Sequence, residues 1–331
     1  MSIRIGLTYD LRSDYILKKE DPEDLNAEFD HGQTINALSK VFTSAGYKVV
    51  RIGNVKNLLS SIDNLGVDIV FNIAEGLCGR NRESQVPILL EMRGIPFVGS
   101  DALTLGLTLD KMFAKKIFIA NDIPTPKFIS VKNPCKLDGI DLKFPIIVKP
   151  RFEGSSKGIN DNSIFIDRQG LVKQCQWLID TYKQPALAEE FIEGKEFTVV
   201  IIGNDDAWAL PVVQIKIDGE LELGNRCYTF SRIHSTTLDY VCPAQISSEM
   251  EEDIKKVALA AYHSVECRDF GRVDIRLDKD NRLYVLEINP LPSLSSQDVF
   301  PVVAKAAGCS YEDLIMKILD EALERYNIRR I

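Results

Sequence analysis

Four side chains near the C-terminal end of the sequence have the chemistry of a metal-binding site. They are two carboxylates, an amide and a guanidinium: Asp274, Glu287, Asn289 and Arg272. Oxygen ligands of this kind suit Mg²⁺, which completes its octahedron with water and phosphate oxygens. The set therefore implies a nucleotide ligand. The alternative is a set of surface charges on an exposed hairpin, with Arg272 and Arg276 as counter-ions.

Two alternating stretches are expected to bring these side chains together. Residues 271–277 and 283–290 alternate polar and aliphatic side chains, and residues 278–282 between them favour a turn, so we expect a β-hairpin. A register that pairs Leu277 with Tyr284 also places the two carboxylates opposite each other, with the amide on the same face. Because like charges in that position repel, we expect a cation between them.

A second candidate stretch follows an apolar strand at residues 144–150. Lys149 ends that strand, and Ser155 and Ser156 follow it between glycines. Such a loop lets successive backbone N–H groups curl toward an anion. It has neither the P-loop nor the Rossmann fingerprint, and a plain Gly/Ser hairpin loop is the alternative. The lysine directly before the loop favours phosphate.

An acidic strand end supplies a third candidate. Glu189 and Glu190 precede the apolar Phe191 and Ile192, an arrangement that could hold an adenine, while the alternative is an ordinary acidic strand end. The long polar segment at residues 224–243 shows no clear pattern and suggests a mobile lid over the site.

Strands and helices must position these stretches. In the first 100 residues or so they alternate, which is typical of βαβ units and a parallel sheet. The expected strands are 3–7, 48–52 and 67–71, and the expected helices are 34–45, 55–62 and 86–92. The loops at 8–14 and 72–83 leave the carboxyl edge of that sheet, where ligands bind in open α/β sheets, although both could be simple connections. Near the C-terminus, a helix capped at Ser310 carries an apolar stripe.

Composition limits the function classes. A chain of 331 residues is expected to form two or three domains, and its net charge of −8 argues against nucleic-acid or anionic-membrane partners. Seven cysteines without C-x-x-C spacing and three histidines (His31, His234, His263) predict neither a disulfide framework nor a zinc site. No apolar run approaches the roughly 20 residues of a membrane span, and no signal peptide is recognisable, so we expect a cytoplasmic protein.

Five motifs occur in the order and spacing of the ATP-grasp superfamily, and the chain in particular resembles D-alanine–D-alanine ligases. They are Lys111, the strand end at 149–150, the loop at 153–156, the segment 189–196 and the hairpin at 271–289. The resemblance runs from about residue 67 to the C-terminus. It implies an ATP-grasp fold of the α/β (α+β) class. Its parts would be an N-terminal parallel-sheet domain at 1–110, a small central domain at 111–195 and a C-terminal sheet domain with the metal site at 196–331.

The resemblance also implies a role for each matching residue. Lys111 and Lys149 would hold the ATP phosphates, and the loop serines Ser155 and Ser156 would close over them. The adenine would contact the segment Glu189, Glu190, Phe191 and Ile192, and the ribose would bond to Glu196. Arg232 stands where the family's lid has a phosphate-binding lysine. Two Mg²⁺ ions, with Mn²⁺ as a possible substitute, would bind Asp274, Glu287 and Asn289. The residues implied in catalysis are Arg272 at the transferring phosphoryl group, Ser156 in the closing loop and the N–H of Ser293 in an oxyanion hole.

The implied substrate side departs from the family. Only Asp10 or Asp14 in the first loop could bind a substrate ammonium, and Glu75 stands where the family has a histidine. Asp298 stands where a family serine anchors the carboxylate of the second substrate. An anion there would repel a carboxylate.

Together these features predict an ATP-dependent carboxylate–amine ligase that forms an amide through an acyl phosphate and releases ADP and phosphate. Its partners would be small amino-acid or amine substrates, and the resemblance implies a homodimer. Three alternatives stay open. They are a ligase for other amino acids or a non-amino-acid amine, a non-catalytic nucleotide-binding protein, and a small-molecule kinase.

Overall fold

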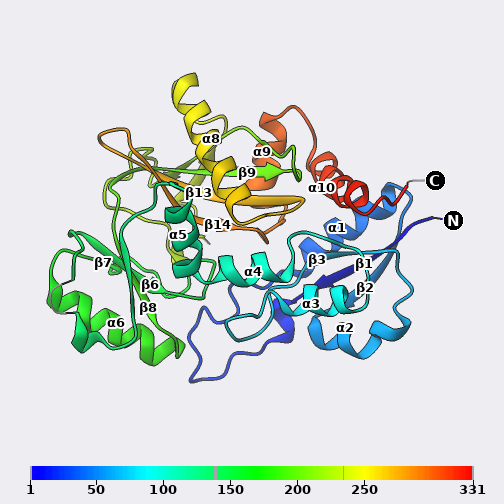
Figure 1. The fold of residues 1–331 in the computed structure, drawn as a ribbon, viewed down its shortest axis with the longest axis horizontal. Coiled ribbons are helices and arrows are strands. Elements are labelled where there is room, and N and C mark those ends of the chain that lie inside the picture. Colours follow the sequence, from blue (N-terminus) through cyan, green and yellow to red (C-terminus); the bar gives the residue numbers. More distant parts are fainter. Residues whose placement is uncertain (1, 138–139, 234, 330–331) are drawn as a thin grey trace.

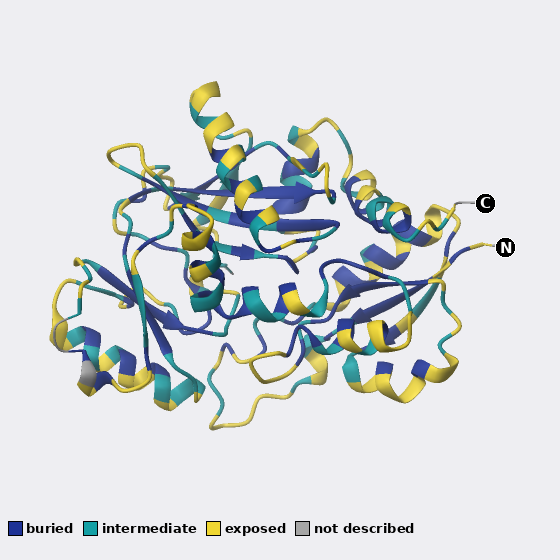
Figure 2. Ribbon diagram, viewed as in Figure 1, coloured by how far each residue is buried: buried dark blue, intermediate teal, exposed yellow. Residues whose placement is uncertain are grey.

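Three β-sheets carry the chain in a computed structural model that describes residues 2–137, 140–233 and 235–329 (Figure 1). Two sheets have four strands each, in the orders β2-β1-β3-β4 and β5-β8-β6-β7, and a third has six. The six-stranded sheet runs β12-β11-β9-β13-β14, with β10 paired to β9. The buried strands lie inside each part while helices cover them with exposed outer faces (Figure 2). The architecture has the predicted α/β (α+β) class, with a parallel N-terminal sheet, a small central sheet and a C-terminal sheet.

The N-terminal sheet is parallel, as the alternation of strands and helices predicts. Its strands are β1 (Arg4–Tyr9), β2 (Lys48–Gly53), β3 (Ile69–Ile73) and β4 (Phe97–Val98), and its helices are α1 (Gly32–Ser44), α2 (Val55–Ser61), α3 (Gln85–Met92) and α4 (Ala102–Leu109). Short 3-10 helices are η1 (Arg12–Asp14) and η2 (Ile62–Asn64). Asn54 caps α2 and Asp101 caps α4 through side-chain oxygens that accept from backbone N–H groups, which fixes where each helix begins.

A small antiparallel sheet follows in the centre of the chain. Its strands are β5 (Phe128–Val131), β6 (Ile146–Pro150), β7 (Ile164–Phe165) and β8 (Ala186–Glu190), and one face is covered by α6 (Arg168–Tyr182). The 3-10 helix η3 (Pro134–Lys136) lies beside α6. Ile146, Val148, Leu171, Leu178 and Ala188 are buried between helix and sheet. This core places Lys149, whose side chain points away from the helix, on the opposite face.

The C-terminal sheet has two helical layers. Its strands are β9 (Gly194–Ile202), β10 (Trp208–Ala209), β11 (Val213–Ile217), β12 (Leu238–Val241), β13 (Phe270–Asp278) and β14 (Leu283–Asn289). The helices are α5 (Lys111–Ala120), α7 (Phe230–Ile233), α8 (Ser248–Ser264), α9 (Val299–Ala306) and α10 (Tyr311–Arg325). Along β9, Val199 and Ile201 pack with α5 and α8, while Val200 and Ile202 pack toward α10, so the period of two buries both faces.

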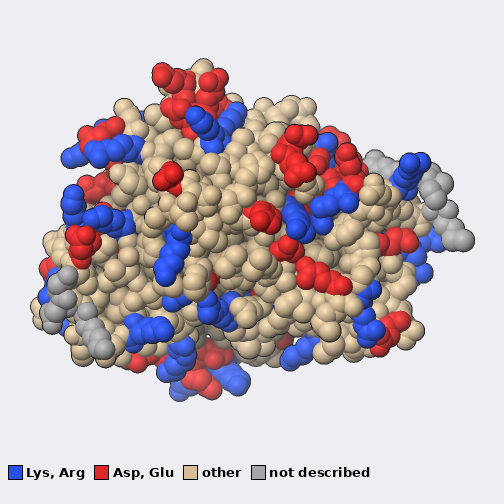
Figure 3. Space-filling model, in the orientation of Figure 1, with Lys and Arg blue, Asp and Glu red and all other residues tan. Residues whose placement is uncertain are grey.

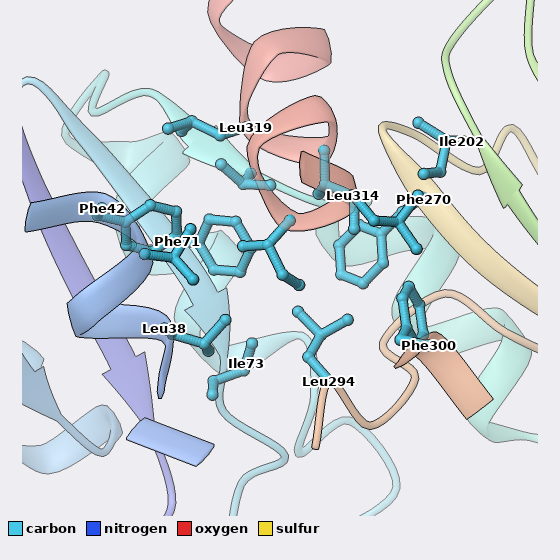
Figure 4. Close-up of a cluster of buried hydrophobic side chains, with 14 of the residues drawn as sticks. Leu38, Phe42, Phe71, Ile73, Ile202, Phe270, Leu294, Phe300, Leu314 and Leu319 are labelled. Carbon is cyan, nitrogen blue, oxygen red and sulfur yellow. The ribbon is translucent and has the colours of Figure 1, made fainter. Parts of the chain in front are cut away.

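One hydrophobic core joins the N-terminal sheet to the C-terminal sheet. Figure 4 shows Phe42 of α1 and Phe71 of β3 packed toward Leu319 of α10, with Phe270 of β13 and Phe300 of α9 beyond. Both ends of the chain therefore hold the two sheets together. The capped stripe predicted after Ser310 is confirmed, because its hydroxyl and Asp313 form a capping box and the apolar face of α10 is buried. The predicted boundaries at residues 110 and 195 stay predictions.

The surface mixes charges of both signs. On the face drawn in Figure 3, Lys and Arg side chains lie among Asp and Glu side chains. In the described ranges, no helix is long and apolar enough to span a membrane.

Candidate active site

The predicted hairpin is present, and it brings the two carboxylates into register. Asp274 on β13 pairs with Glu287 on β14, and Arg272 pairs with Asn289. The predicted pairing of Leu277 with Tyr284 is wrong by one residue, because Leu277 pairs with Leu283. A β-bulge between Asp274 and Ile275 absorbs the extra residue, so the pairing at the functional end is the predicted one.

A cavity of about 650 Å³ lies where the three sheets meet. Its walls are the β6 strand end with the loop at 154–158, the hairpin of β13 and β14, the segment at 227–240, and the N-terminal loops at 27–31 and 75–83. A cavity of this size, lined by apolar side chains together with charged ones, is typical of a small-molecule site.

The serine loop has the backbone geometry of an anion cradle. Ser155 and Ser156 have φ angles of 46° and 54°, so two successive residues are left-handed, and both line the cavity. Left-handed conformation is costly for residues other than glycine and persists only where the surroundings enforce it. Successive N–H groups held this way converge on one point and can bind an anion.

A segment of the N-terminal domain holds this loop at both ends. Glu28 accepts hydrogen bonds from the N–H of Gly154 at 2.6 Å and from Nζ of Lys157 at 2.5 Å. Asp24 accepts from the N–H of Gly158 at 2.8 Å and from the hydroxyl of Tyr182. The segment at residues 20–30, which we call the strap, is the blue loop that leaves the N-terminal sheet in Figure 1. It offsets the strain of the serine loop.

The strap belongs to a buried ion network. Arg82 donates to Glu28 at 2.6 Å and Lys157 donates to Glu153 at 2.6 Å, and all four side chains are largely buried. Burial alone would raise the pKa of Glu28, but Arg82 and Lys157 outweigh it and lower this pKa to about 2. The Glu28 carboxylate is therefore charged at neutral pH, which strengthens its hydrogen bonds to the loop.

Two lysines pair with Glu189 at the next wall of the cavity, which Lys149 and Glu189 line. Lys149 Nζ lies 2.6 Å from Glu189 Oε1, and Lys115 Nζ lies 3.0 Å from Glu189 Oε2. Burial lowers the pKa of Lys115 to about 8, whereas Glu189 raises the pKa of Lys149 despite its burial. Lys149 thus brings a charged ammonium group to the wall that also includes the serine loop.

Another wall of the cavity is built on the hairpin of β13 and β14. Nε and one Nη of Arg272 each donate to Asp274 at 3.2 Å, and the hydroxyl of Thr198 donates to Asp274 at 2.6 Å. Asn289 donates its amide N–H to Asp274 at 3.1 Å. Glu287 lies 3.4 Å from Lys111 Nζ, and this lysine, Lys149 and Arg272 lower its pKa to about 2 against the effect of burial. Both carboxylates thus face cationic groups.

These residues fit the expected divalent ions by donor chemistry. Asp274, Glu287 and Asn289 supply only oxygen ligands, and Glu287 is charged at any neutral pH. The described residues contain no group of three His, Cys, Asp or Glu side chains placed to hold a metal without further ligands. Mg²⁺ accepts such a sparse protein contribution, because phosphate oxygens and water fill its remaining positions.

The wall formed by the N-terminal domain is acidic. Glu75 and Glu83 line the cavity, and neither accepts a hydrogen bond from the described part of the chain. The nearest ion-pair partner of Glu83 is Arg82 at 3.9 Å, and Arg82 is already bonded to Glu28. Burial raises the pKa of Glu83 to about 7 and that of Glu75 well above its ordinary value. This wall suits a ligand that brings a cation.

Asp298 provides a second acidic point, at the start of α9. Its Oδ1 accepts from the N–H of Val299 at 2.8 Å and from the hydroxyl of Tyr240 at 3.3 Å. Tyr240 is in turn hydrogen-bonded to Tyr228. The segment predicted to be a lid includes β12, which pairs with β11, and it supplies these two tyrosines to the cavity. Its mobility stays a prediction. His234 lies outside the described residues.

Most residues predicted for the site line this one cavity. They are Lys111, Lys149, Ser155, Ser156, Glu189, Glu190, Phe191, Ile192, Glu196, Arg272, Asp274, Glu287, Asn289, Ser293, Glu75 and Asp298. Arg232 is not in the lining, since its guanidinium bonds to Asp161 and to the carbonyl oxygen of Cys227. Asp14 is exposed on η1 and is not in the lining either. Its alternative, Asp10, is buried and accepts from Tyr15 and from the N–H of Gly76.

Sequence reasoning missed several residues that shape the cavity. Glu28 and Asp24 contact the serine loop from more than 120 positions away in sequence, and no local pattern signals such contacts. Lys115 looks like an ordinary helix lysine. Arg276 could have been found, because it follows Arg272 and Asp274 at the same period of two.

The fold and the cavity together define an ATP-grasp enzyme. Residues 119–320, over half of the chain, match the family described as "D-ala D-ala ligase C-terminus". The chain belongs to the D-alanine–D-alanine ligase family and is an ATP-dependent ligase.

Individual relatives agree with this assignment. A D-alanine–D-alanine ligase of Carboxydothermus hydrogenoformans is 33% identical over 303 residues, which cover 88% of this chain and 93% of that one. An uncharacterised protein of Sinorhizobium fredii, y4sG, is also 33% identical over 303 residues and 89% of each chain. The structure of a Bacillus anthracis D-alanine–D-alanine ligase complexed with ATP shares the fold, with a TM-score of 0.77 at 24% identity over 98% of this chain and 99% of that one.

Proposed function

We propose that this ligase joins the carboxylate of a small amino acid to an amine in two steps within the cavity, with an acyl phosphate between them. The observation that supports it best is that one cavity contains both the serine loop with its lysines and the Arg272 hairpin. A carboxylate is a poor electrophile. Phosphorylation converts its oxygen into a leaving group that an amine can displace.

The chain's own residues have distinct tasks in this reaction. Lys111, Lys149 and the N–H groups around Ser155 and Ser156 bind and orient the ATP phosphates. Arg272, beside Asp274, stabilises the negative charge that develops on the transferring phosphoryl group and then on the tetrahedral carbon centre. The N–H of Ser293 would donate to that same oxyanion. The serine loop and the segment at 227–240 exclude water, which would otherwise hydrolyse the acyl phosphate.

For ATP, the adenine would lie against Glu190, Phe191 and Ile192, and the ribose would bond to Glu196. Asp274, Glu287 and Asn289 would hold two Mg²⁺ ions, or Mn²⁺, which neutralise phosphate charge when bound. The supporting observation is the oxygen-only donor set next to the lysine pair. Counting bound metal per chain in the presence of ADP and phosphate tests the number of ions.

The activity is tested by amine-dependent release of ADP over a panel of D- and L-amino acids and simple amines. Mass spectrometry of the product identifies the amide. We expect ADP release only with both an acid and an amine, and a product whose mass is their sum less one water. A stable phosphorylated product would favour the small-molecule kinase, and ATP binding without turnover would favour the non-catalytic protein.

The second candidate within this class is a ligase whose acceptor is an amine without a carboxylate, or an amino acid other than D-alanine. Asp298 favours it, because its carboxylate is an acceptor-only group where a substrate carboxylate would need a donor. Glu75 and Glu83 also favour a cationic ligand. Strong turnover with D-alanine alone would remove this candidate.

Assembly and location are also proposals. The resemblance to the family supports a homodimer, which light scattering of the purified chain would test. It likewise supports a cytoplasmic location, which cell fractionation would test.

A further inference from the structure

Arg276 is a deeply buried charged side chain beside the proposed nucleotide pocket, and the proposed chemistry gives it no task. Arg276 is 1% exposed and lies on β13 two residues after Asp274, directly opposite Glu196 on β9. It lines the cavity together with Phe191. A charge in such a place is costly unless several partners compensate it.

The guanidinium group of Arg276 bonds to three separate segments. Its Nε donates to Glu196 Oε2 at 2.9 Å, one Nη donates to the carbonyl oxygen of Ile192 at 2.6 Å, and the other donates to the carbonyl oxygen of Arg226 at 2.5 Å. The group also lies 4.5 Å from the ring centre of Phe191. Its acceptors therefore come from β9, from the connection between β8 and β9, and from the start of the lid segment.

Each of these contacts bears on the nucleotide pocket. Burial raises the pKa of Glu196, and Arg276 is the neighbour that opposes this rise, while Asp274 and Glu287 add to it. Without the guanidinium, the carboxylate would lose its only ion-pair partner in the described part of the chain. A planar fork with five donors can bond three acceptors at fixed angles, which a lysine cannot.

We propose that Arg276 is a positioning residue that aims Glu196 at the ribose hydroxyls and fixes the start of the lid segment, residues 224–243, against the nucleotide pocket. This rests on the proposed function, because it takes Glu196 as the ribose ligand. Arg276 thereby links the strand of Arg272 to the lid through one side chain. A purely structural ion pair would instead affect all nucleotides equally.

The test is a set of binding measurements with ADP and 2′,3′-dideoxy-ADP, which cannot react. Isothermal titration of the wild type should show at least roughly tenfold tighter binding of ADP, as expected for lost hydrogen bonds to a charged group. In R276M, and likewise in E196Q, this ratio should fall toward one. The double variant R276M/E196Q should show no further fall, since both act on the same interaction.

Matched variants separate positioning from folding. R282M removes an exposed arginine of the same hairpin and should keep the wild-type ratio. Limited proteolysis should cut residues 224–243 of R276M faster than those of R282M. If R276M does not fold, R276K keeps the charge, and we expect its ratio to fall by about threefold because one ammonium cannot bond all three acceptors.

The possible failures are distinct. A wild type that does not bind ADP would overturn the proposed function, and this inference with it. A wild type that binds ADP without discriminating against the dideoxy form would overturn only the inference. The inference would also be overturned if R276M kept the wild-type ratio of ADP to dideoxy-ADP affinity while E196Q lost it.

Discussion

The buried carboxylates at the two ends of the cavity differ in how closely cationic groups pair with them. On the nucleotide side, Glu189, Glu196 and Glu287 each lie within 3.4 Å of a lysine or arginine nitrogen. On the N-terminal wall, Glu75 and Glu83 accept no hydrogen bond from described residues, and their pKa values are raised. The difference teaches that the carboxylates on the proposed nucleotide side are paired before a ligand arrives, whereas Glu75 and Glu83 favour a ligand that brings a cation.

Removing Arg272 should have the largest effect, because we propose it as the cation at the reacting centre. For R272M we expect kcat to fall by about 10²–10³-fold, as for other transition-state donors, with little change in ADP affinity. Steady-state ADP release and titration with ADP measure the two effects, with R282M as the control. A kcat within threefold of the wild type would show that Arg272 does not act in the reaction.

Removing a paired carboxylate should destabilise the protein. In E28Q, Arg82 and Lys157 lose their charged partner, so the free energy of unfolding should fall by about 3 kcal/mol at pH 7. The pKa of Glu28 is lowered to about 2, so its contribution is present at neutral pH and is lost as the pH falls toward 2. The loss in E28Q should therefore shrink in acid. Urea unfolding at several pH values checks this, and an undiminished loss at pH 3 would contradict it.

Removing Glu83, whose ion pair with Arg82 is 3.9 Å long, should do the opposite. The pKa of Glu83 is raised by burial to about 7, so the folded protein binds a proton there that the unfolded chain releases above its ordinary pKa. Glu83 therefore costs stability as the pH rises through this window. Relative to the wild type, E83Q should gain up to about 3 kcal/mol between pH 4 and pH 8. An equal effect at both pH values would place Glu83 among the paired carboxylates.

The smallest effect is expected at Asp298. D298S keeps a cap for α9 but removes the anion near Tyr240. We expect kcat/KM for acceptors with a carboxylate to rise about tenfold relative to acceptors without one. Competition between an amino acid and its decarboxylated amine, read by mass spectrometry, measures this ratio. An unchanged ratio would mean that Asp298 does not contact the acceptor.

The sequence predicts the nucleotide side well because that side rests on local periodicity. Asp274 and Glu287 face each other because strand residues alternate, and the bulge beside Asp274 corrects an error at the turn without disturbing them. The lysine before the serine loop is likewise visible in a short stretch. The predicted resemblance to D-alanine–D-alanine ligases is confirmed by the family match.

The parts of the cavity that depend on long-range contacts were harder to predict. Glu28 and Asp24 are far in sequence from the serine loop that they hold. Asp14 follows a strand at the expected edge, yet η1 turns it into solvent. Arg232 bonds to Asp161, which is 71 residues away in sequence, and no local pattern signals that contact; its role at the phosphates stays a prediction.

The most direct test of the central claim follows the oxygen atoms of the substrate. A carboxylic acid that proves to be a substrate is labelled with ¹⁸O in its carboxylate and incubated with ATP, Mg²⁺ and the amine. The account predicts one ¹⁸O atom in inorganic phosphate for each amide formed, because the carboxylate oxygen attacks the γ-phosphorus and leaves with it. Unlabelled phosphate, released together with ADP and amide, would contradict an acyl phosphate in this cavity.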